Sequence, residues 1–336
     1  MELPKSLIEA IEYFSDEQRC IDTVAHWRWP DGKPTCPDCG NKEPYYLATQ
    51  KRWKCRFGKC GRQFSVKVGT IFEDSAISLK KWLPAMWLLA NCKNGISSHE
   101  LARDLKVTQK TAWFILQRIR LVMHEEPAGT FGSHWGNPIE VDETFVGGKV
   151  KNMHRSRANA IRAQIPIDRM NGFETSLKNK TVVMGMLNRE TRQVRAKVIP
   201  NVKRETLQAE ILKNVGFNAH VYTDQHVGYD GLDKNVKNFT HRTTNHLTEY
   251  VRGRVHTQGI ENFWSLLKRG LNGTYVAVEP FHLDRYVAEQ VFRFNNRATK
   301  DNPLTDADRF ALLLSRIADK RLTYAQVTGK EDDRQL

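Results

Sequence analysis

The chain has 336 residues, with 52 Lys and Arg against 38 Asp and Glu, and a formal net charge of +14. Hydrophobic residues make up 40% of it, including 8 Trp and 15 Phe, which is enough for more than one packed core and excludes a disordered chain. The longest apolar run, residues 82–92, is too short for a membrane span, and the N-terminal residues lack a signal-peptide pattern. We therefore expect a basic multidomain protein of the cytoplasm or nucleoid, with no membrane partner.

Residues 1–30 form the first predicted segment. Leu7, Ile8, Ile11 and Phe14 are apolar at helical spacing, and a turn signal follows at residues 30–32. The pattern predicts one amphipathic helix that serves packing.

Four cysteines in the next segment, residues 31–75, have the spacing of a metal site. Two residues separate Cys36 from Cys39, four separate Cys55 from Cys60, and fifteen lie between the pairs. Two such loops can bring four thiolates around one Zn²⁺, and metal binding supplies folding free energy that so short a segment lacks. Because four protein ligands close the coordination shell, we expect a small zinc ribbon with one structural Zn²⁺.

The second half of this ribbon is strongly basic, since no acidic residue interrupts its cations before Glu73. The cations are Lys51, Arg52, Lys54, Arg56, Lys59, Arg62 and Lys67, interleaved with Trp53, Phe57 and Phe64. Such a run is usually a solvated face, yet seven uncompensated cations on a small scaffold favour contact with a phosphate backbone. Arg52 and Lys54 are therefore candidate DNA-binding residues.

Residues 76–127 predict an all-α helix-turn-helix domain. Ser97 and Thr108 fit the N-caps of two helices, with Val107 in the turn between them. The second helix has an apolar face of Ala112, Ile115, Leu116 and Ile119. Outward positions in such a helix read base edges in a major groove, although trihelical cores also occur without DNA. The residues expected to point outward and bind DNA are Gln109, Lys110, Gln117 and Arg118.

Residues 135–300 predict an α/β domain with a mixed sheet. A strand at 139–149 would carry Asp142 on the side opposite Ile139 and Val141, although Asp is disfavoured in mid-strand. Strands at 181–187 and 193–199, a helix at 204–215 and a strand at 220–223 follow, and the last ends at Asp224. Glu261 then lies on a helix with the apolar face Ile260, Phe263, Trp264 and Leu267. This order of elements is that of a ribonuclease-H-like fold.

Phosphoryl transfer on DNA explains why Asp142, Asp224 and Glu261 would converge in this fold. Two Mg²⁺ (or Mn²⁺) ions can activate the attacking oxygen and stabilise the leaving oxygen, and such hard cations take oxygen ligands. Alternative carboxylates are Glu140, Glu143, Asp230 and Glu249, and His256 could assist Glu261 or act as a ligand.

Two further segments complete the chain. Between residues 148 and 180 lies a long basic insertion, for which both a functional DNA-contacting flap and a disordered loop are expected. Residues 301–336 predict one C-terminal helix and a polar tail.

Taken together, these blocks resemble a bacterial insertion-sequence DDE transposase, of the family with an N-terminal zinc ribbon ahead of an integrase-like catalytic core. The resemblance covers residues 12–300 and is carried by CGRQFSVKVGTIFEDS, GISSHELARDLKVTQKTAW, VDETFVGGK, YTDQHVGY and HTQGIENFWSLLKRG. It implies a ribonuclease-H-like core with the acidic triad Asp142, Asp224 and Glu261. It also implies that Lys268 contacts terminal DNA phosphates, with Arg269 extending the basic surface.

We therefore expect a DNA transposase that binds the terminal inverted repeats of an insertion sequence as double-stranded DNA. It would act as a homo-oligomer on DNA and catalyse metal-dependent strand cleavage, followed by strand transfer into target DNA. One alternative is a catalytically silent, domesticated transposase acting as a DNA-binding regulator, which the three carboxylates argue against. The other is a ribonuclease-H-like nuclease for RNA hybrids or junctions, which the base-reading front end argues against.

Overall fold

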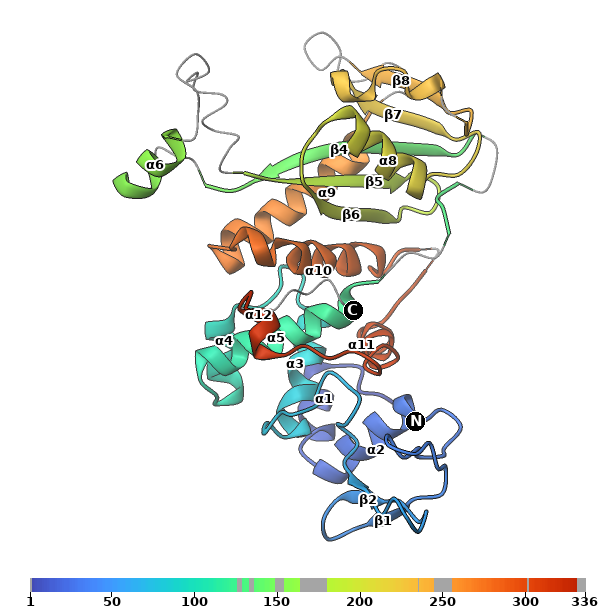
Figure 1. Cartoon of the computed structure of the whole chain (residues 1–336), viewed down its shortest axis with the longest axis vertical. Helices are drawn as coiled ribbons and strands as arrows, with labels where there is room; N and C mark the ends of the chain where they lie inside the picture. The colour runs from blue at the N-terminus through green and yellow to red at the C-terminus, as the bar shows by residue number, and fades with distance from the viewer. Residues whose placement is uncertain are drawn as a thin grey trace. The chain divides into compact units, whose positions relative to one another are not determined.

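The computed structural model describes residues 2–125, 129–132, 136–148, 154–163, 180–234, 236–244, 256–300 and 302–330 (Figure 1). The chain divides into two compact units. Unit 1 contains residues 1–125 and 296–336, and unit 2 contains residues 126–295. Most of the predicted basic insertion lies outside the described residues, apart from helix α6 (Arg155–Arg162). None of the described helices is long and apolar enough to cross a membrane.

Unit 1 begins with two short helices, so the prediction of a single N-terminal helix is wrong. α1 (Leu7–Tyr13) and α2 (Glu17–Arg28) are separated at Asp16, whose side chain accepts hydrogen bonds from the backbone N–H groups of Gln18 and Arg19. This carboxylate caps α2 and so starts a new helix. On the predicted apolar face only Phe14 is buried, while Leu7, Ile8 and Ile11 are exposed.

A small three-stranded antiparallel sheet follows α2. It consists of β1 (Tyr45–Leu47), β2 (Arg52–Lys54) and β3 (Gln63–Phe64), in that order. Trp53 and Phe64 are buried, and the Trp53 ring packs edge-on against Trp29 with centroids 5.1 Å apart. Aromatic rings therefore provide the core of a segment that has few aliphatic residues.

The helical part of unit 1 contains α3 (Leu79–Asn91), α4 (Ser98–Leu105) and α5 (Gln109–Met123). The predicted N-caps are confirmed, because the side chains of Ser97 and Thr108 accept hydrogen bonds from backbone N–H groups in the first turns of α4 and α5. The predicted apolar face of α5 is also buried: Ala112, Ile115, Leu116 and Ile119.

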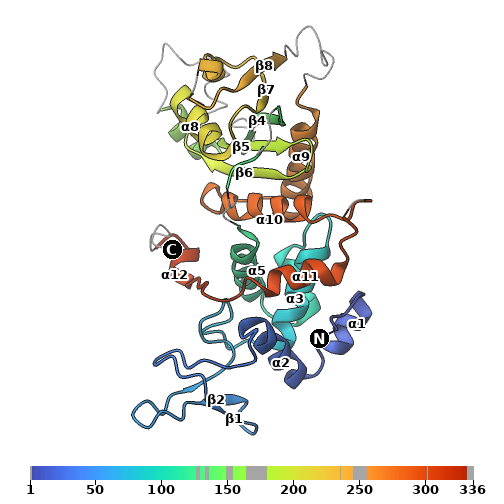
Figure 2. The ribbon, with the colours of Figure 1, turned by 90° about the vertical axis from the view of Figure 1, so that its right-hand side faces the viewer.

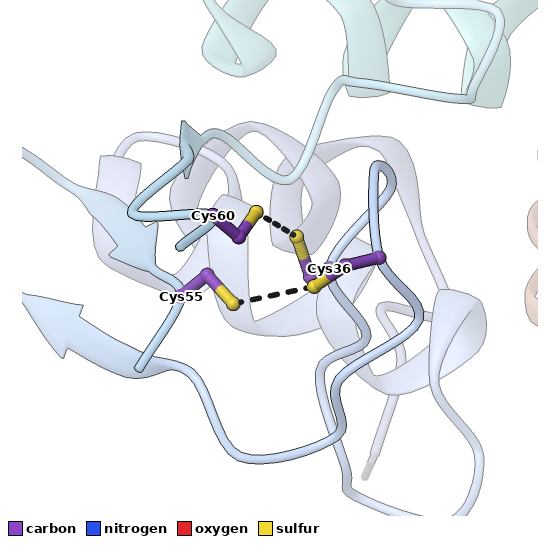
Figure 3. A group of neighbouring side chains, drawn as sticks. Cys36, Cys55 and Cys60 are labelled. Carbon is purple, nitrogen blue, oxygen red and sulfur yellow. Dashed lines mark hydrogen bonds between the residues drawn. The ribbon is translucent and has the colours of Figure 1, made fainter. Parts of the chain in front are cut away.

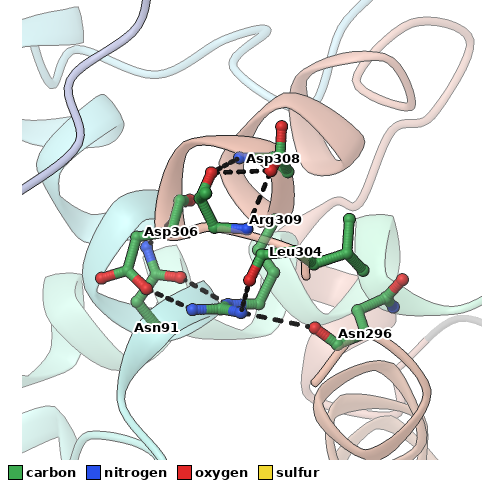
Figure 4. Close-up of polar contacts among 7 residues, drawn as sticks. Asn91, Asn296, Leu304, Asp306, Asp308 and Arg309 are labelled. Atoms are coloured by element: carbon green, nitrogen blue, oxygen red, sulfur yellow. Dashed lines mark hydrogen bonds and ion pairs between the residues drawn. The ribbon is translucent and has the colours of Figure 1, made fainter. Parts of the chain in front are cut away.

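The C-terminal segment packs within unit 1 through α11 (Asp306–Leu314) and α12 (Tyr324–Val327). The Arg309 guanidinium donates to Asn91 Oδ1 of α3 at 2.8 Å and to the carbonyl oxygens of Asn296 and Leu304 (Figure 4). Phe310, Leu313 and Leu314 are fully buried. Unit 1 is thus built from two chain segments that unit 2 separates, whereas the sequence indicated only consecutive domains.

Two side chains of α5 do not point outward as predicted. Gln117 is fully buried and Arg118 is 4% exposed. The Arg118 guanidinium donates to the carbonyl oxygens of Leu322, Ile71 and Glu73. The prediction is wrong because residues 71–73 and the C-terminal segment cover a side of α5 that helical periodicity left open.

Replacing Arg118 with leucine should lower the stability of unit 1 by about 2–4 kcal/mol, because two buried carbonyl oxygens and a partly buried one lose their donor. Thermal unfolding of the zinc-loaded protein measures this change. Lys110→Ala, at an exposed position of the same helix, is the control and should cost less than about 1 kcal/mol. Equally small effects of both substitutions would contradict a buried structural role for Arg118.

Unit 2 is built on a five-stranded mixed sheet in the order β6-β5-β4-β7-β8. The first three strands along the chain, β4 (Pro138–Val146), β5 (Thr181–Asn188) and β6 (Val194–Ile199), are antiparallel neighbours. β7 (His220–Asp224) pairs parallel with β4, and β8 (Thr240–Thr244) pairs parallel with β7. The sequence pattern predicted four of these strands but not β8.

Helices cover both faces of this sheet (Figure 2). α8 (Arg204–Asn214) packs on the face that carries Ile139 and Val141. α9 (Gln258–Arg269) and α10 (Leu283–Asn295) pack on the other face, and the π-helical turn η5 (Gly270–Tyr275) continues α9. Short 3₁₀ helices are η3 (Val227–Tyr229), η4 (Leu232–Lys234) and η6 (Pro280–His282). Because side chains alternate along a strand, the residues of β4 between these apolar positions face α9.

Candidate functional site

The four predicted cysteines come together in unit 1. The sulfur atoms of Cys36 and Cys60 are 3.7 Å apart, and those of Cys39 and Cys55 are 3.5 Å apart (Figure 3). All four sulfur atoms lie within 4.8 Å of one another. A tetrahedral Zn²⁺ with Zn–S distances of about 2.3 Å requires sulfur–sulfur separations of about 3.8 Å, so this arrangement fits one zinc ion.

Hydrogen-bond donors favour the thiolate form of one of the four cysteines, Cys55. The backbone N–H of Phe57 donates to Cys55 Sγ at 3.4 Å, and Asn41 Nδ2 donates to the same atom at 3.6 Å. Burial would raise the pKa of Cys55, but these hydrogen bonds outweigh it and lower the pKa to about 7. Four cysteine side chains around one point are the donor set of a structural zinc site.

Several cations of the ribbon are compensated within unit 1, so the description of seven uncompensated cations is wrong. Lys51 Nζ lies 2.6 Å from a Glu17 carboxylate oxygen, and Arg62 Nε lies 3.6 Å from one of Asp38. Lys67 Nζ donates to two backbone carbonyl oxygens. The two candidate DNA contacts on β2 are Arg52, which is exposed, and Lys54, which is half-buried.

In unit 2 the first two predicted acids meet on the central strand β4 and its neighbour β7, just beyond the last paired residues of these two strands. β4 and β7 are parallel neighbours, so Asp142 lies beside Asp224 at the end of β7. Burial, followed by the charges of Glu143 and Asp224, raises the pKa of Asp142 to about 7. These carboxylates are therefore close enough for each negative charge to disfavour the others.

Glu143, one of the alternative carboxylates, belongs to the same cluster. Burial raises its pKa to about 7; a hydrogen bond from the Tyr229 hydroxyl opposes this shift, and the charge of Asp224 adds to it. His226 Nδ1 lies 3.8 Å from Glu143 Oε1. The cluster therefore joins β4 to the end of β7 and to η3, which follows it.

Glu261 lies on α9 as predicted, but its carboxylate does not complete a three-acid group. The side chain is exposed and accepts a hydrogen bond from the Thr257 hydroxyl at 2.8 Å. Within the described part of the chain, only the four cysteines form a group of three or more potential ligands with all ligand atoms within 4.8 Å of one another. Lys268 and Arg269 are exposed at the end of the same helix.

Hydrogen bonds to two acidic side chains of β4 fix α9 to the sheet. The backbone N–H of Ile260 donates to Glu140 Oε2 at 2.9 Å, and Trp264 Nε1 donates to Asp142 Oδ2 at 2.9 Å. Glu140 is fully buried, and its Oε1 pairs with Arg189 Nε at 2.6 Å. Both oxygens of Glu140 are thus engaged by the protein itself, which favours a structural role for this alternative carboxylate.

His256 also lies beside this buried pair. Its Nδ1 is 3.5 Å from Glu140 Oε1. Burial, followed by the charge of Arg189, lowers the pKa of His256. The imidazole ring of His256 therefore lies against the carboxylate of Glu140.

The partners of these acids, namely Arg189, Tyr229 and the indole N–H of Trp264, were not predicted from the sequence. One local signal was available, because Gly185 interrupts an otherwise apolar strand. A glycine inside a strand often marks the close approach of another element. Here it lies directly opposite Asp142 in the β4–β5 register and under the Trp264 ring.

The crowded acids should make unit 2 less stable at neutral pH than at pH 4–5 when divalent cations other than zinc are absent. Asp142 ionises near pH 4 in an unfolded chain and near pH 7 in the fold, so its ionisation destabilises the fold progressively between these values. Asp142→Asn should therefore raise stability by about 1–3 kcal/mol at pH 8 and by little at pH 4.5, as measured by thermal unfolding. The exposed Asp233→Asn is the control, and a gain of equal size at both pH values for Asp142→Asn would contradict the raised pKa.

Two known domain families match the chain in tandem. Residues 15–63 match the transposase zinc-ribbon domain, and residues 135–295 match the ISXO2-like transposase domain. The chain belongs to the insertion-sequence transposases that carry these two domains. The second match runs from the start of β4 to the end of α10, so Asp142, Asp224 and Glu261 all lie within the transposase domain.

Individual proteins are also similar to this transposase. An uncharacterised protein of transposable element ISH50 from Halobacterium salinarum is 28% identical over 270 residues, which are 78% of this chain and 85% of the relative. A chain of the simian T-cell lymphotropic virus intasome, solved by cryoEM in complex with PP2A regulatory subunit B56 gamma, is 14% identical. That likeness covers 68% of this chain and 74% of the other, with a TM-score of 0.30, which is too low to support an argument about the fold.

Proposed function

We propose that this transposase binds the terminal inverted repeats of its insertion sequence and catalyses metal-dependent cleavage and strand transfer of DNA. The observation that carries the proposal is the closeness of Asp142, on the central strand β4, to Asp224, at the end of the neighbouring strand β7, within the domain that matches a transposase family. Glu261, on the helix that is bonded to the Asp142 strand, is the third member of the catalytic group. The sheet order, three antiparallel strands followed by two parallel ones, supports a ribonuclease-H-like core.

The donor set at this site fits Mg²⁺ or Mn²⁺. It consists of carboxylate oxygens, which hard cations prefer, and the mutual repulsion of Asp142, Glu143 and Asp224 is the kind that a bound cation relieves. Two such ions, when bound, would supply charge stabilisation to the attacking and leaving oxygens of a phosphodiester. The chain's own part is to hold the carboxylates at fixed positions on β4, β7 and α9.

Cationic side chains near this site would orient the DNA. Lys268 and Arg269 are exposed on α9, and Lys268 follows Glu261 along the exposed side of the helix. Lys268 could then contact a terminal DNA phosphate while Asp142, Asp224 and Glu261 act on the adjacent phosphodiester bond.

Unit 1 would supply recognition of the element ends. α4 and α5 have the lengths and short connection of a helix-turn-helix, and Gln109 and Lys110 are exposed at the start of α5, where such a helix reaches base edges. Arg52 and Lys54 on the ribbon would add phosphate contacts. Gln117 and Arg118 are left out of this interface because they are buried.

Synapsis of two element ends requires at least two copies of the chain, so we infer a homo-oligomer on double-stranded DNA. Its substrate, chromosomal DNA, locates the protein in the cytoplasm at the nucleoid. The cysteine cluster would hold one structural Zn²⁺ in each copy.

The decisive experiment is strand cleavage of duplex DNA that carries the element's own ends, in Mg²⁺, in Mn²⁺ and without divalent cation. Glu261→Gln and Asp142→Asn should each lower the cleavage rate by at least about 1,000-fold, because they remove an oxygen charge from the metal site and leave the fold intact. Their end binding in a gel-shift assay should equal that of the wild type.

Exposed Glu279, outside the proposed catalytic group, offers the matched Glu279→Gln control. Tight binding of the ends without cleavage by the wild type in any metal would favour the catalytically silent regulator. Cleavage that ignores the end sequence would favour a general nuclease.

Removal of zinc should unfold the ribbon and leave unit 2 folded. Zinc binding contributes about 10–16 kcal/mol in comparable small domains, far more than the ribbon's few buried rings can replace. Cys55→Ser should therefore reduce bound zinc to below one ion per chain and abolish end binding, as measured by metal analysis and gel shift. Cys92→Ser, a cysteine outside the cluster, should change neither, and normal end binding by zinc-free protein would contradict this role.

A further inference from the structure

The indole of Trp264 is bonded directly to the first acid of the site. Trp264 is 5% exposed, and its Nε1 donates to Asp142 Oδ2 at 2.9 Å. Most buried indole N–H groups have an acceptor, and leaving one unpaired costs about 1–3 kcal/mol. The contact therefore restrains the ring and the carboxylate together.

Gly185 provides the space that this contact needs. It is the cross-strand neighbour of Asp142 on β5, on the same face of the sheet. A Cβ at this position would lie 2.6 and 2.7 Å from two ring carbons of Trp264 and 2.9 Å from Ile260 Cδ1. Any larger residue would push the ring away from the strand, so the glycine is required for the indole to reach the carboxylate.

A second contact, one helical turn earlier, fixes the register of α9. The backbone N–H of Ile260 donates to Glu140 Oε2, and Gly259 permits this approach because its Cβ would lie 2.8 Å from the same oxygen. Glu140 and Asp142 are two positions apart on one face of β4, as Ile260 and Trp264 are four apart on α9. Two hydrogen bonds thus hold α9 to β4, one to Glu140 and one to Asp142. The second of them is made to the proposed catalytic acid.

We propose that Trp264 is a positioning residue, which holds the Asp142 carboxylate in the orientation that binds the divalent cation together with Asp224. This inference rests on the proposed function. One carboxylate oxygen is held by the indole, so the group cannot rotate freely when the cation or DNA arrives. Partners of this kind, which orient a ligand without touching the metal, typically change metal affinity or activity by about 10- to 100-fold.

The test measures Mn²⁺ binding to zinc-loaded protein without DNA, from the electron paramagnetic resonance signal of free Mn²⁺. Trp264→Phe should weaken Mn²⁺ binding by about 10- to 100-fold. A second variant carries β-(3-benzothienyl)alanine at position 264, which keeps the bicyclic ring and replaces only the N–H by sulfur. It should fold as the wild type and show the same loss, whereas unchanged Mn²⁺ affinity in this variant overturns the proposal.

Trp87→Phe is the matched control, because Trp87 is also 5% exposed and its buried Nε1 has no hydrogen-bond partner among the described residues. It should leave Mn²⁺ affinity unchanged. In protein that already carries Asp142→Asn, the substitution Trp264→Phe should have no further effect, since the acid through which it acts is gone. A loss of the same size in both backgrounds would show that Trp264 acts through packing and would overturn the proposal.

The design separates this inference from the proposed function. If Asp142→Asn weakens Mn²⁺ binding and the benzothienyl variant does not, the metal site is supported and the proposed role of Trp264 is rejected. If Asp142→Asn binds Mn²⁺ as tightly as the wild type, the metal site is absent from these acids and both proposals fall.

Discussion

The position of α9 in unit 2 depends on the fully buried carboxylate of Glu140. Its two oxygens accept hydrogen bonds from Arg189 Nε and from the backbone N–H of Ile260. A buried carboxylate is tolerated only when charge and hydrogen bonds compensate its lost hydration, so the chain must bring both donors to this point of β4. The contact sets where α9 lies on the sheet, and the places of Trp264 and Glu261 on that helix follow from it.

The neighbouring acids Asp142 and Glu143 differ from Glu140 in their electrostatics. Glu140 is paired within the protein, whereas burial, together with the charge of Asp224, raises the pKa of both Asp142 and Glu143. Such an arrangement costs stability and is typical of sites that act on a charged substrate or bind a cation. The hydrogen bonds from Trp264 and Tyr229 reduce this cost while keeping the carboxylates oriented.

In unit 1 the first 75 residues lack a large continuous core and are stabilised in another way. A cluster of four cysteines and a few aromatic rings organise the ribbon. Residues after position 295 complete the packing of the helical part. Arg309 of α11 bonds to Asn91, and the carbonyl oxygen of Leu322 accepts a hydrogen bond from Arg118. The part proposed to read DNA therefore requires both ends of the chain, and the transposase domain is inserted between them.

The sequence by itself determined what depends on local spacing: the cysteine pairs, the caps of α4 and α5, the alternation along β4 and the buried face of α9. These features follow from the geometry of a single element, and a few residues are enough to reveal them. The tertiary structure alone decided what depends on neighbours distant in the chain. Arg118 is buried because residues 71–73 and 322 cover it, and Gly185 matters because Trp264, far along the chain, lies above it. Periodicity describes which side of an element is apolar, and it carries no information about which other element covers that side.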